Sequence, residues 1–256
     1  FDLHDSQNRR NLSKSLPSEY DKDCDTVPAF NQVIHSLLDF GKTKVQYCSH
    51  LAAHAASAYY LSPFSEATVL VVDGGLGVFS GRGNCLEIID MNGYNDSWIN
   101  GTPSELANVS GTGPLYNFVT TKLGFSCFDA GKTMALASFS HEFDKKDIYP
   151  LPDNRHQDVI INYRPTIEWI RKNVPTFDEM VGAEQGDGLV SKFWVNLARQ
   201  SQQILEEDVL FIAESAIRKC NSKNLAYAGG VALSCITNRK IIDAGLVDNI
   251  FVQPAS

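Results

Sequence analysis

Two histidines one helical turn apart are the first candidates for chemistry in this sequence. His50 and His54 stand at positions i and i+4, so on a helix their imidazoles would lie side by side on one face. Imidazole nitrogens bind Fe²⁺, Zn²⁺ and Mn²⁺, while carboxylate, water or substrate oxygens fill the remaining positions. The spacing alone fits two interpretations: a divalent metal site, or two helix-surface histidines with hydrogen-bond partners.

The turn Asp73-Gly74-Gly75 is a second candidate, because it ends the apolar run at residues 69–72. Glycine lets backbone N–H groups approach a phosphate, and the aspartate can hold a metal or its water. Asp-Gly is also a favoured hairpin dipeptide, so an ordinary hairpin turn is the alternative.

Two glycine-rich loops, at residues 110–113 and 229–230, each come before a predicted helix. Free N–H groups and the helix dipole make such a position a general anion site. The spacing is not that of a P-loop. Lys132, beside a glycine, could reach a phosphate or an acidic partner. Together these features favour a nucleotide held between two lobes.

The elements that must hold these residues indicate a mixed α/β fold. Periodicity predicts helices at residues 28–40, 50–60, 114–123, 165–173, 191–219 and 232–244. It predicts strands at residues 45–48, 69–72, 78–80, 86–89, 225–228 and 249–253. The three strands between 69 and 89 form a meander of hairpins, and strand–helix–strand units follow near the C-terminus. Residues 1–27 are polar and aperiodic, which predicts an arm or loop.

Composition excludes several classes of partner. The 256 residues carry 22 basic and 30 acidic side chains, so a partner bound through nucleic-acid phosphates is not expected. No apolar run approaches the about 20 residues of a membrane span, and residues 1–15 are too polar for a signal peptide. Six scattered cysteines are typical of reduced thiols. We expect a cytoplasmic protein, and the Phe1 start and the strand near the end suggest a fragment truncated at both ends.

Four blocks, taken in order, resemble the carbamoyltransferase family that includes the nodulation and antibiotic O-carbamoylation enzymes. The first is HLAAHAASAYYLSPF at residues 50–64, which is similar to the family pattern HHxxHAxSAYxxSPF. The second is the VVDGG turn at 71–75. The third comprises GTGPLY, LGF and GKTMALA within 111–137. The fourth is LAYAGGVALSCITN at 225–238, followed by FVQP.

The resemblance implies an actin/sugar-kinase-like (ASKHA) two-lobed domain over residues 28–256, with mixed sheets flanked by helices. It implies transfer of a carbamoyl group from carbamoyl-adenylate to a hydroxyl of a small-molecule acceptor. A YrdC-like domain, absent from this sequence, would make carbamoyl-adenylate from ATP and carbamoyl phosphate. The implied metal is Fe²⁺, with Zn²⁺ or Mn²⁺ as alternatives and Mg²⁺ as a possible companion of ATP. A homodimer is a further expectation.

The resemblance also implies roles for individual residues. His50 and His54 would bind the metal together with an aspartate past Ser256, and Asp73 and His54 would serve catalysis. The residues expected to bind the nucleotide or carbamoyl-adenylate are Gly74, Gly75, Gly111, Gly113, Lys132, Gly229, Gly230, Ser234 and Asn238.

Three departures from the family pattern keep other functions open. Leu51 replaces the second histidine of the first block, Ser234 replaces an asparagine, and residues 76–78 lack the usual acidic side chain. One alternative is therefore a degenerate nucleotide-binding or scaffold domain without turnover. Another is a tRNA threonylcarbamoyl transferase-like enzyme.

Overall fold

The computed structural model describes residues 49–92, 111–139, 148–153, 155–156, 161–177 and 191–256. The predictions for residues 1–27, 28–40 and 45–48 lie outside these ranges. The helices are α3 (His50–Tyr59), α4 (Thr112–Lys122), α5 (Ala130–Ala137), α6 (Arg164–Asn173), α8 (Lys192–Cys220) and α9 (Cys235–Asp243), with a 3₁₀ turn η5 (Gly230–Leu233). The strands are β1 (Glu66–Val72), β2 (Leu76–Arg82), β3 (Cys85–Asn92), β4 (Asn224–Ala228) and β5 (Asn249–Val252).

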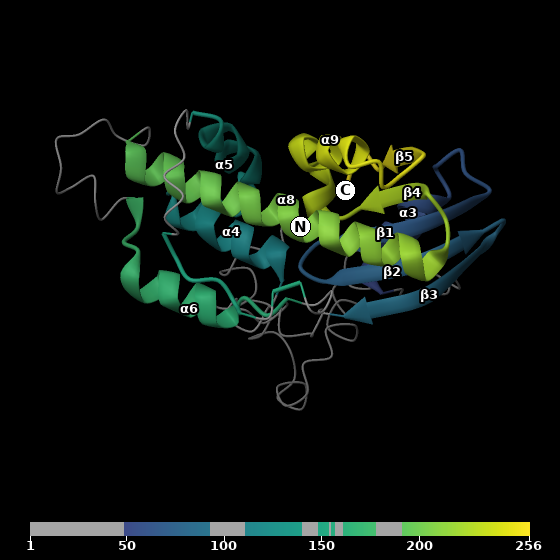
Figure 1. Cartoon of the computed structure of the whole chain (residues 1–256), viewed down its shortest axis with the longest axis horizontal. Helices are drawn as coiled ribbons and strands as arrows, with labels where there is room; N and C mark the ends of the chain where they lie inside the picture. The colour runs from purple at the N-terminus through teal and green to yellow at the C-terminus, as the bar shows by residue number, and fades with distance from the viewer. Residues whose placement is uncertain (1–48, 93–110, 140–147, 154, 157–160, 178–190) are drawn as a thin grey trace, which may run out of the picture.

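The strands form one five-stranded mixed sheet in the order β3-β2-β1-β4-β5. The predicted meander is confirmed, since β1, β2 and β3 pair antiparallel through tight turns. Strand β4 then pairs parallel with β1, and β5 pairs parallel with β4. A parallel neighbour needs a crossover connection, and in this chain the helical segments between β1 and β4 supply it (Figure 1).

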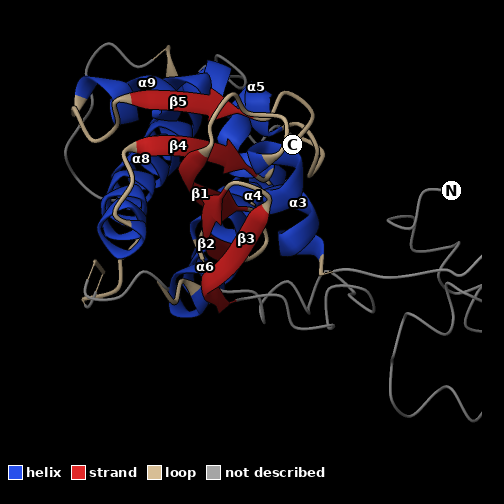
Figure 2. Cartoon of the chain, turned by 90° about the vertical axis from the view of Figure 1, so that its right-hand side faces the viewer, coloured by secondary structure: helices blue, strands red, loops and turns tan. Residues whose placement is uncertain are grey.

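Alternating side chains of β1 face opposite sides of the sheet, as the two-residue period of a strand requires. Val69 and Val71 belong to the apolar cluster that includes α3, while Leu70 and Val72 belong to the cluster that includes α8. The sheet therefore lies between α3 on one face and α8 with α9 on the other (Figure 2).

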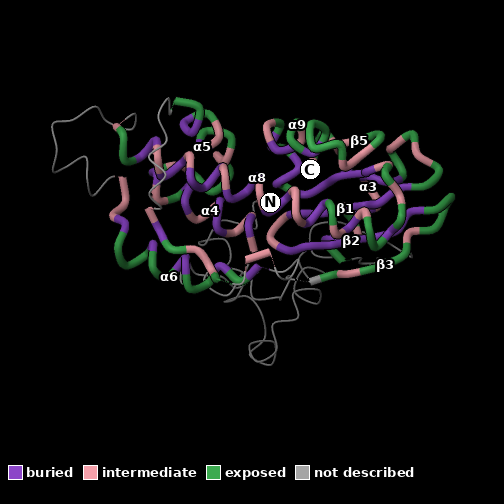
Figure 3. Tube along the Cα trace, in the orientation of Figure 1, coloured by how far each residue is buried: buried purple, intermediate pink, exposed green. Residues whose placement is uncertain are grey.

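Helix α8 joins this sheet to a helical half of the molecule. At 29 residues it is about 44 Å long, and it runs the length of the described structure (Figure 1). Its first part packs with α4, α5 and α6 in one apolar cluster, and its second part packs against the sheet in another. Figure 3 shows the buried positions running through both halves. This arrangement agrees with the predicted two-lobed α/β fold.

Two elements differ from the sequence predictions. The helix predicted at 232–244 begins at Cys235, because residues 230–233 form η5 and Ser234 acts as the N-cap by accepting from the Thr237 amide. Helix α5 was not predicted, because its eight residues are too few to display a helical period. Within the described ranges, none of the helices combines the length and apolarity that crossing a bilayer needs.

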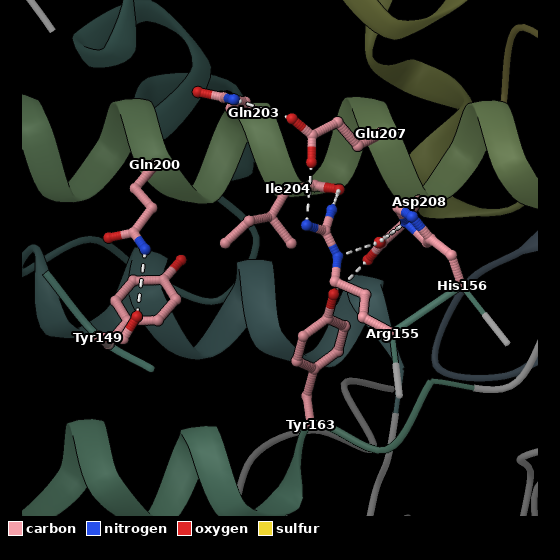
Figure 4. Close-up of polar contacts among 9 residues, drawn as sticks. All are labelled: Tyr149, Arg155, His156, Tyr163, Gln200, Gln203, Ile204, Glu207 and Asp208. Carbon is pink, nitrogen blue, oxygen red and sulfur yellow. Dashed lines mark hydrogen bonds and ion pairs between the residues drawn. The ribbon is translucent and has the colours of Figure 1, made fainter. Parts of the chain in front are cut away.

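A buried carboxylate on α8 fixes the chain between α5 and α6 to this helix. Asp208 is fully buried and accepts from Arg155 Nε at 2.8 Å, His156 Nε2 at 2.9 Å and Tyr163 Oη at 2.7 Å (Figure 4). Burial and the charge of Asp208 both raise the pKa of Tyr163, so its hydroxyl stays protonated and keeps donating. The cluster joins the segment before α6 to the spine of the fold.

We predict that Asp208→Asn lowers the free energy of unfolding by about 3 kcal/mol, because it leaves the Arg155 guanidinium, which is only 13% exposed, without its nearest counter-charge. Glu207→Gln is the matched control, since Glu207 contacts the same arginine at 2.9 Å but is 42% exposed. Its loss should cost about 1 kcal/mol or less. Urea denaturation of both variants measures the difference, and equal losses would show that burial of Asp208 is not what matters.

Candidate metal centre and cavity

Helix α3 carries the histidine pair beside the face that it packs against the sheet. Its buried face is Leu51, Ala55, Ala58 and Tyr59, and the alanines let the helix approach the small side chains of β4 closely. His50 and His54 lie one turn apart beside this face, with ring centroids 4.6 Å apart. The close packing of α3 brings both rings to the end of β1.

Asp73 follows the last residue of β1 and completes the cluster. Its Oδ2 atom lies 2.8 Å from His50 Nε2 and 3.4 Å from His54 Nε2, and the two Nε2 atoms are 3.0 Å apart. The other carboxylate oxygen, Oδ1, accepts from the Gly230 amide at 3.3 Å. One side chain thus joins α3, the β1–β2 turn and the turn after β4.

The electrostatics keep this carboxylate ionised. Burial alone would raise the pKa of Asp73, but hydrogen bonds and charge from His50 and His54 outweigh it and hold the pKa well below its usual range. An ionised carboxylate beside two imidazoles is a strong ligand set for a divalent cation.

The three side chains fit a metal ion in both chemistry and spacing. Their ligand atoms all lie within 4.8 Å of one another. Metal–ligand bonds of about 2.1 Å place neighbouring ligand atoms about 3.0 Å apart at right angles and about 3.4 Å apart in a tetrahedron. The observed separations of 2.8, 3.0 and 3.4 Å match these values. Two imidazoles and one carboxylate are also the donor set of non-haem Fe²⁺ and of catalytic Zn²⁺ sites.

Asp73 therefore supplies a third candidate ligand within this sequence. From the sequence we expected that Asp73 could hold a metal or its water. The family resemblance implied that the third protein ligand is an aspartate past Ser256. The structure brings the carboxylate to both histidines without any later residue. A further aspartate past Ser256 stays a prediction.

The cluster borders a cavity of about 550 Å³ between the sheet and the helical half, a volume within the usual range for small-molecule sites. Of the predicted site residues, seven line this cavity: His50, His54, Asp73, Gly74, Gly113, Gly230 and Ser234. The sequence alone could not have shown that α3, the β1–β2 turn, α4 and the η5 turn meet at one place.

The other predicted nucleotide-binding residues lie outside the cavity lining, at Gly75, Gly111, Lys132, Gly229 and Asn238. Lys132 Nζ pairs with Asp129 at 3.0 Å. Of the two partners considered from the sequence, a phosphate or an acidic side chain, the structure shows the acidic one. Asn238 Nδ2 donates to the Ala232 carbonyl at 2.7 Å and so holds η5 against α9. Contact of these residues with a nucleotide stays a prediction.

Sequence reasoning missed the side chains that form most of the cavity wall. They include Pro114, Tyr116, Asn117, Phe128, Met134, Leu205, Val231 and Leu233. A signal existed on α4, where Tyr116 and Asn117 follow Gly113 at the i+3 and i+4 spacing of one helix face. The contributions of α5 and α8 depend on tertiary packing, which no local pattern encodes.

Gly113 sets how closely α4 approaches the cluster. A Cβ atom at this position would lie 2.6 Å from the Asp73 carbonyl oxygen, so Gly113→Ala must move α4 or the turn. We predict that divalent-metal affinity falls by about tenfold and that stability falls by about 1–3 kcal/mol. Gly131→Ala is the matched control, because Gly131 also lines the cavity but a Cβ there would meet nothing within 4 Å. Metal titration and thermal unfolding measure both effects, and identical behaviour of the two variants would refute the close-approach argument.

Asp73→Asn tests the cluster as a metal site, because it keeps the size of the side chain and removes its charge. We predict that the affinity for Fe²⁺ or Zn²⁺ falls at least about 100-fold, more than loss of an outer-sphere partner usually costs. Asp243→Asn, which removes an exposed carboxylate of α9, should bind metal as the unmodified protein does. Anaerobic calorimetry and elemental analysis give affinity and stoichiometry. Unchanged binding in Asp73→Asn would remove this residue from the ligand set.

Comparison with known proteins identifies a family for this chain. The family model for the carbamoyltransferase N-terminus matches residues 25–256. The nodulation protein NolNO of Sinorhizobium fredii is 27% identical over 84% of this chain and 29% of its own length. NolO of Bradyrhizobium diazoefficiens is 25% identical over 81% of this chain and 35% of its own length. An uncharacterized protein of Synechocystis is 28% identical over 81% and 33%.

The chain spans about a third of the length of these curated relatives. The family match covers most of the chain, including α3, the Asp73 turn, the cavity and α9. By this match the chain belongs to the carbamoyltransferase N-terminus family.

Proposed function

We propose that this chain is the transfer domain of an O-carbamoyltransferase, which moves a carbamoyl group from carbamoyl-adenylate to a hydroxyl of a small molecule. The observation that carries the proposal is the His50–His54–Asp73 cluster at the border of the cavity, in a chain of the carbamoyltransferase family. In the reaction, a bond forms between the acceptor oxygen and the carbonyl carbon. The bond from that carbon to the phosphate oxygen breaks, AMP leaves and the hydroxyl proton is released.

His50, His54 and Asp73 would hold the divalent cation, Fe²⁺ being the first choice and Zn²⁺ or Mn²⁺ alternatives. When bound, such an ion supplies a Lewis acid that polarises carbonyl and phosphate oxygens. Asp73 has a second role, because its Oδ1 atom fixes the Gly230 turn at the edge of the cavity. His54 is the more buried of the two histidines, with 19% of its side chain exposed against 49% for His50.

The cavity wall would bind and shield the donor. Gly113 and Gly230 let backbone groups come close to a phosphate, which is how glycine loops recognise anions. Val231, Met134 and Phe128 add apolar surface, which excludes water that would otherwise hydrolyse an activated carbamoyl group. We assign the formation of carbamoyl-adenylate from ATP and carbamoyl phosphate to a separate YrdC-like domain of the full-length protein.

Transfer by the full-length protein tests this function. With ATP, carbamoyl phosphate, Mg²⁺ and Fe²⁺ under anaerobic conditions, we expect mass spectrometry to detect an O-carbamoylated product among a panel of hydroxylated small molecules. Asp73→Asn should lower kcat/KM at least about 100-fold, or about 2.7 kcal/mol of transition-state stabilisation. The exposed Asp243→Asn should retain activity.

Two results would contradict the proposal. Transfer that persists in Asp73→Asn would place the chemistry elsewhere in the protein. Nucleotide binding without a carbamoylated product, for any acceptor in the panel, would favour a nucleotide-binding domain without turnover.

A further inference from the structure

The turn after β4 packs directly on the end of β1. The two strands pair in parallel, so they end side by side. Gly229 has a φ of 94°, and a Cβ atom there would lie 2.4 Å from the Val72 carbonyl oxygen. The turn is therefore fixed against β1, and the next residue, Gly230, is brought to the side chain of Asp73.

The two oxygens of the Asp73 carboxylate have different surroundings. Oδ2 lies 2.8 Å from His50 Nε2 and 3.4 Å from His54 Nε2, whereas Oδ1 accepts from the Gly230 amide at 3.3 Å. The fit on that side is close, because a Cβ atom at Gly230 would lie 3.2 Å from Oδ1. One oxygen thus faces the histidines, and the other faces the backbone of the turn.

This division matters because a carboxylate can bind a cation through one oxygen or through both. The last torsion of an aspartate side chain is broad, so the carboxylate turns easily unless a second contact holds it. Carboxylates that bind metals are usually hydrogen-bonded by a group outside the ligand set, and loss of such a partner costs about 10–100-fold in metal affinity. The Gly230 amide has the position that such a partner needs.

We propose that the Gly230 amide is a positioning group of the metal centre. It holds Asp73 Oδ1, so that Oδ2 alone is offered to the ion together with His50 and His54. This inference rests on the metal centre of the proposed function. A position that a second carboxylate oxygen would occupy is thereby left for a substrate oxygen. Because this amide is committed to Asp73, the phosphate contact expected at the turn falls to its other backbone groups.

The same turn connects the metal centre to the cavity wall. Gly230 begins η5, and Val231, Leu233 and Ser234 after it also line the cavity. The bond from the Gly230 amide to Asp73 is 3.3 Å long, against a usual length of about 2.9–3.0 Å, so an ion that fixes the carboxylate can shorten it. Metal loading should therefore hold this part of the wall in place, an effect that a merely structural turn would not show.

Zinc titration of the full-length protein tests the positioning role. Gly230→Ala places a Cβ atom against Oδ1, so the carboxylate must turn away. We expect the Zn²⁺ affinity to fall about tenfold, the lower end of the usual loss of an outer-sphere partner. Gly131→Ala is the matched control and should bind Zn²⁺ normally, because Gly131 also lines the cavity but a Cβ atom there would meet nothing within 4 Å. Equal affinities of the two variants would overturn the proposal.

Amide hydrogen exchange separates positioning from a merely structural role of the turn. Measured residue by residue in the full-length protein, exchange of the Gly230 amide should slow at least about tenfold at saturating Zn²⁺, because the ion fixes its acceptor. The control is the Gly245 amide, which donates to the Ile242 carbonyl at the end of α9 and should exchange at the same rate with and without Zn²⁺. In Asp73→Asn, Zn²⁺ should change neither rate.

The outcomes distinguish this proposal from the metal centre on which it rests. Zn²⁺ that binds to His50, His54 and Asp73 but leaves exchange at Gly230 unchanged would refute the positioning role alone. Slowing that persists in Asp73→Asn would also refute it, because the effect would not pass through this carboxylate. Absence of Zn²⁺ binding by the unmodified protein would refute both the positioning role and the metal centre.

Discussion

The Asp73 carboxylate is the interaction on which the candidate site depends. One oxygen lies against both histidines of α3, and the other accepts from the amide of Gly230. Because the residue directly follows the central strand β1, its position is fixed by the pairing of β1 with β2 on one side and β4 on the other. Three segments far apart in the sequence are thereby held around one negative charge. A divalent cation bound by the two histidines would be stabilised by this negative charge. The fold places the charge at the border of the cavity.

Small residues make this convergence possible. Alanines of α3 and β4 face each other in the core, which places the histidines close to the end of β1. Gly113 allows α4 to contact the Asp73 carbonyl, and Gly229 has a positive φ of 94° at a place where a side chain would collide with the carbonyl of Val72. These glycines thus allow two backbone segments to pack closely together, in addition to any role in binding a ligand. This explains why Gly229 is needed although it lies outside the cavity lining.

Local patterns in the sequence predicted much of the fold and the core of the site. The i and i+4 spacing predicted that His50 and His54 share a helix face, and the Asp-Gly turn was predicted from the end of an apolar strand; both are observed. The contact between Asp73 and the two histidines could not be predicted, because it depends on how α3 packs against β1. For Lys132, the local pattern suggested a partner that the structure does not show. A lysine beside a glycine suggests a phosphate contact, but Asp129, three residues earlier on the same turn, pairs with Lys132.

The central claim is that His50, His54 and Asp73 together bind one divalent ion at the cavity. Anomalous X-ray diffraction from crystals of the full-length protein loaded with Zn²⁺ or Fe²⁺ tests it most directly. We predict one strong anomalous peak per chain, about 2.1 Å from both Nε2 atoms and from Asp73 Oδ2. A fully loaded crystal whose ion lies elsewhere, or binds without Asp73, would contradict the account.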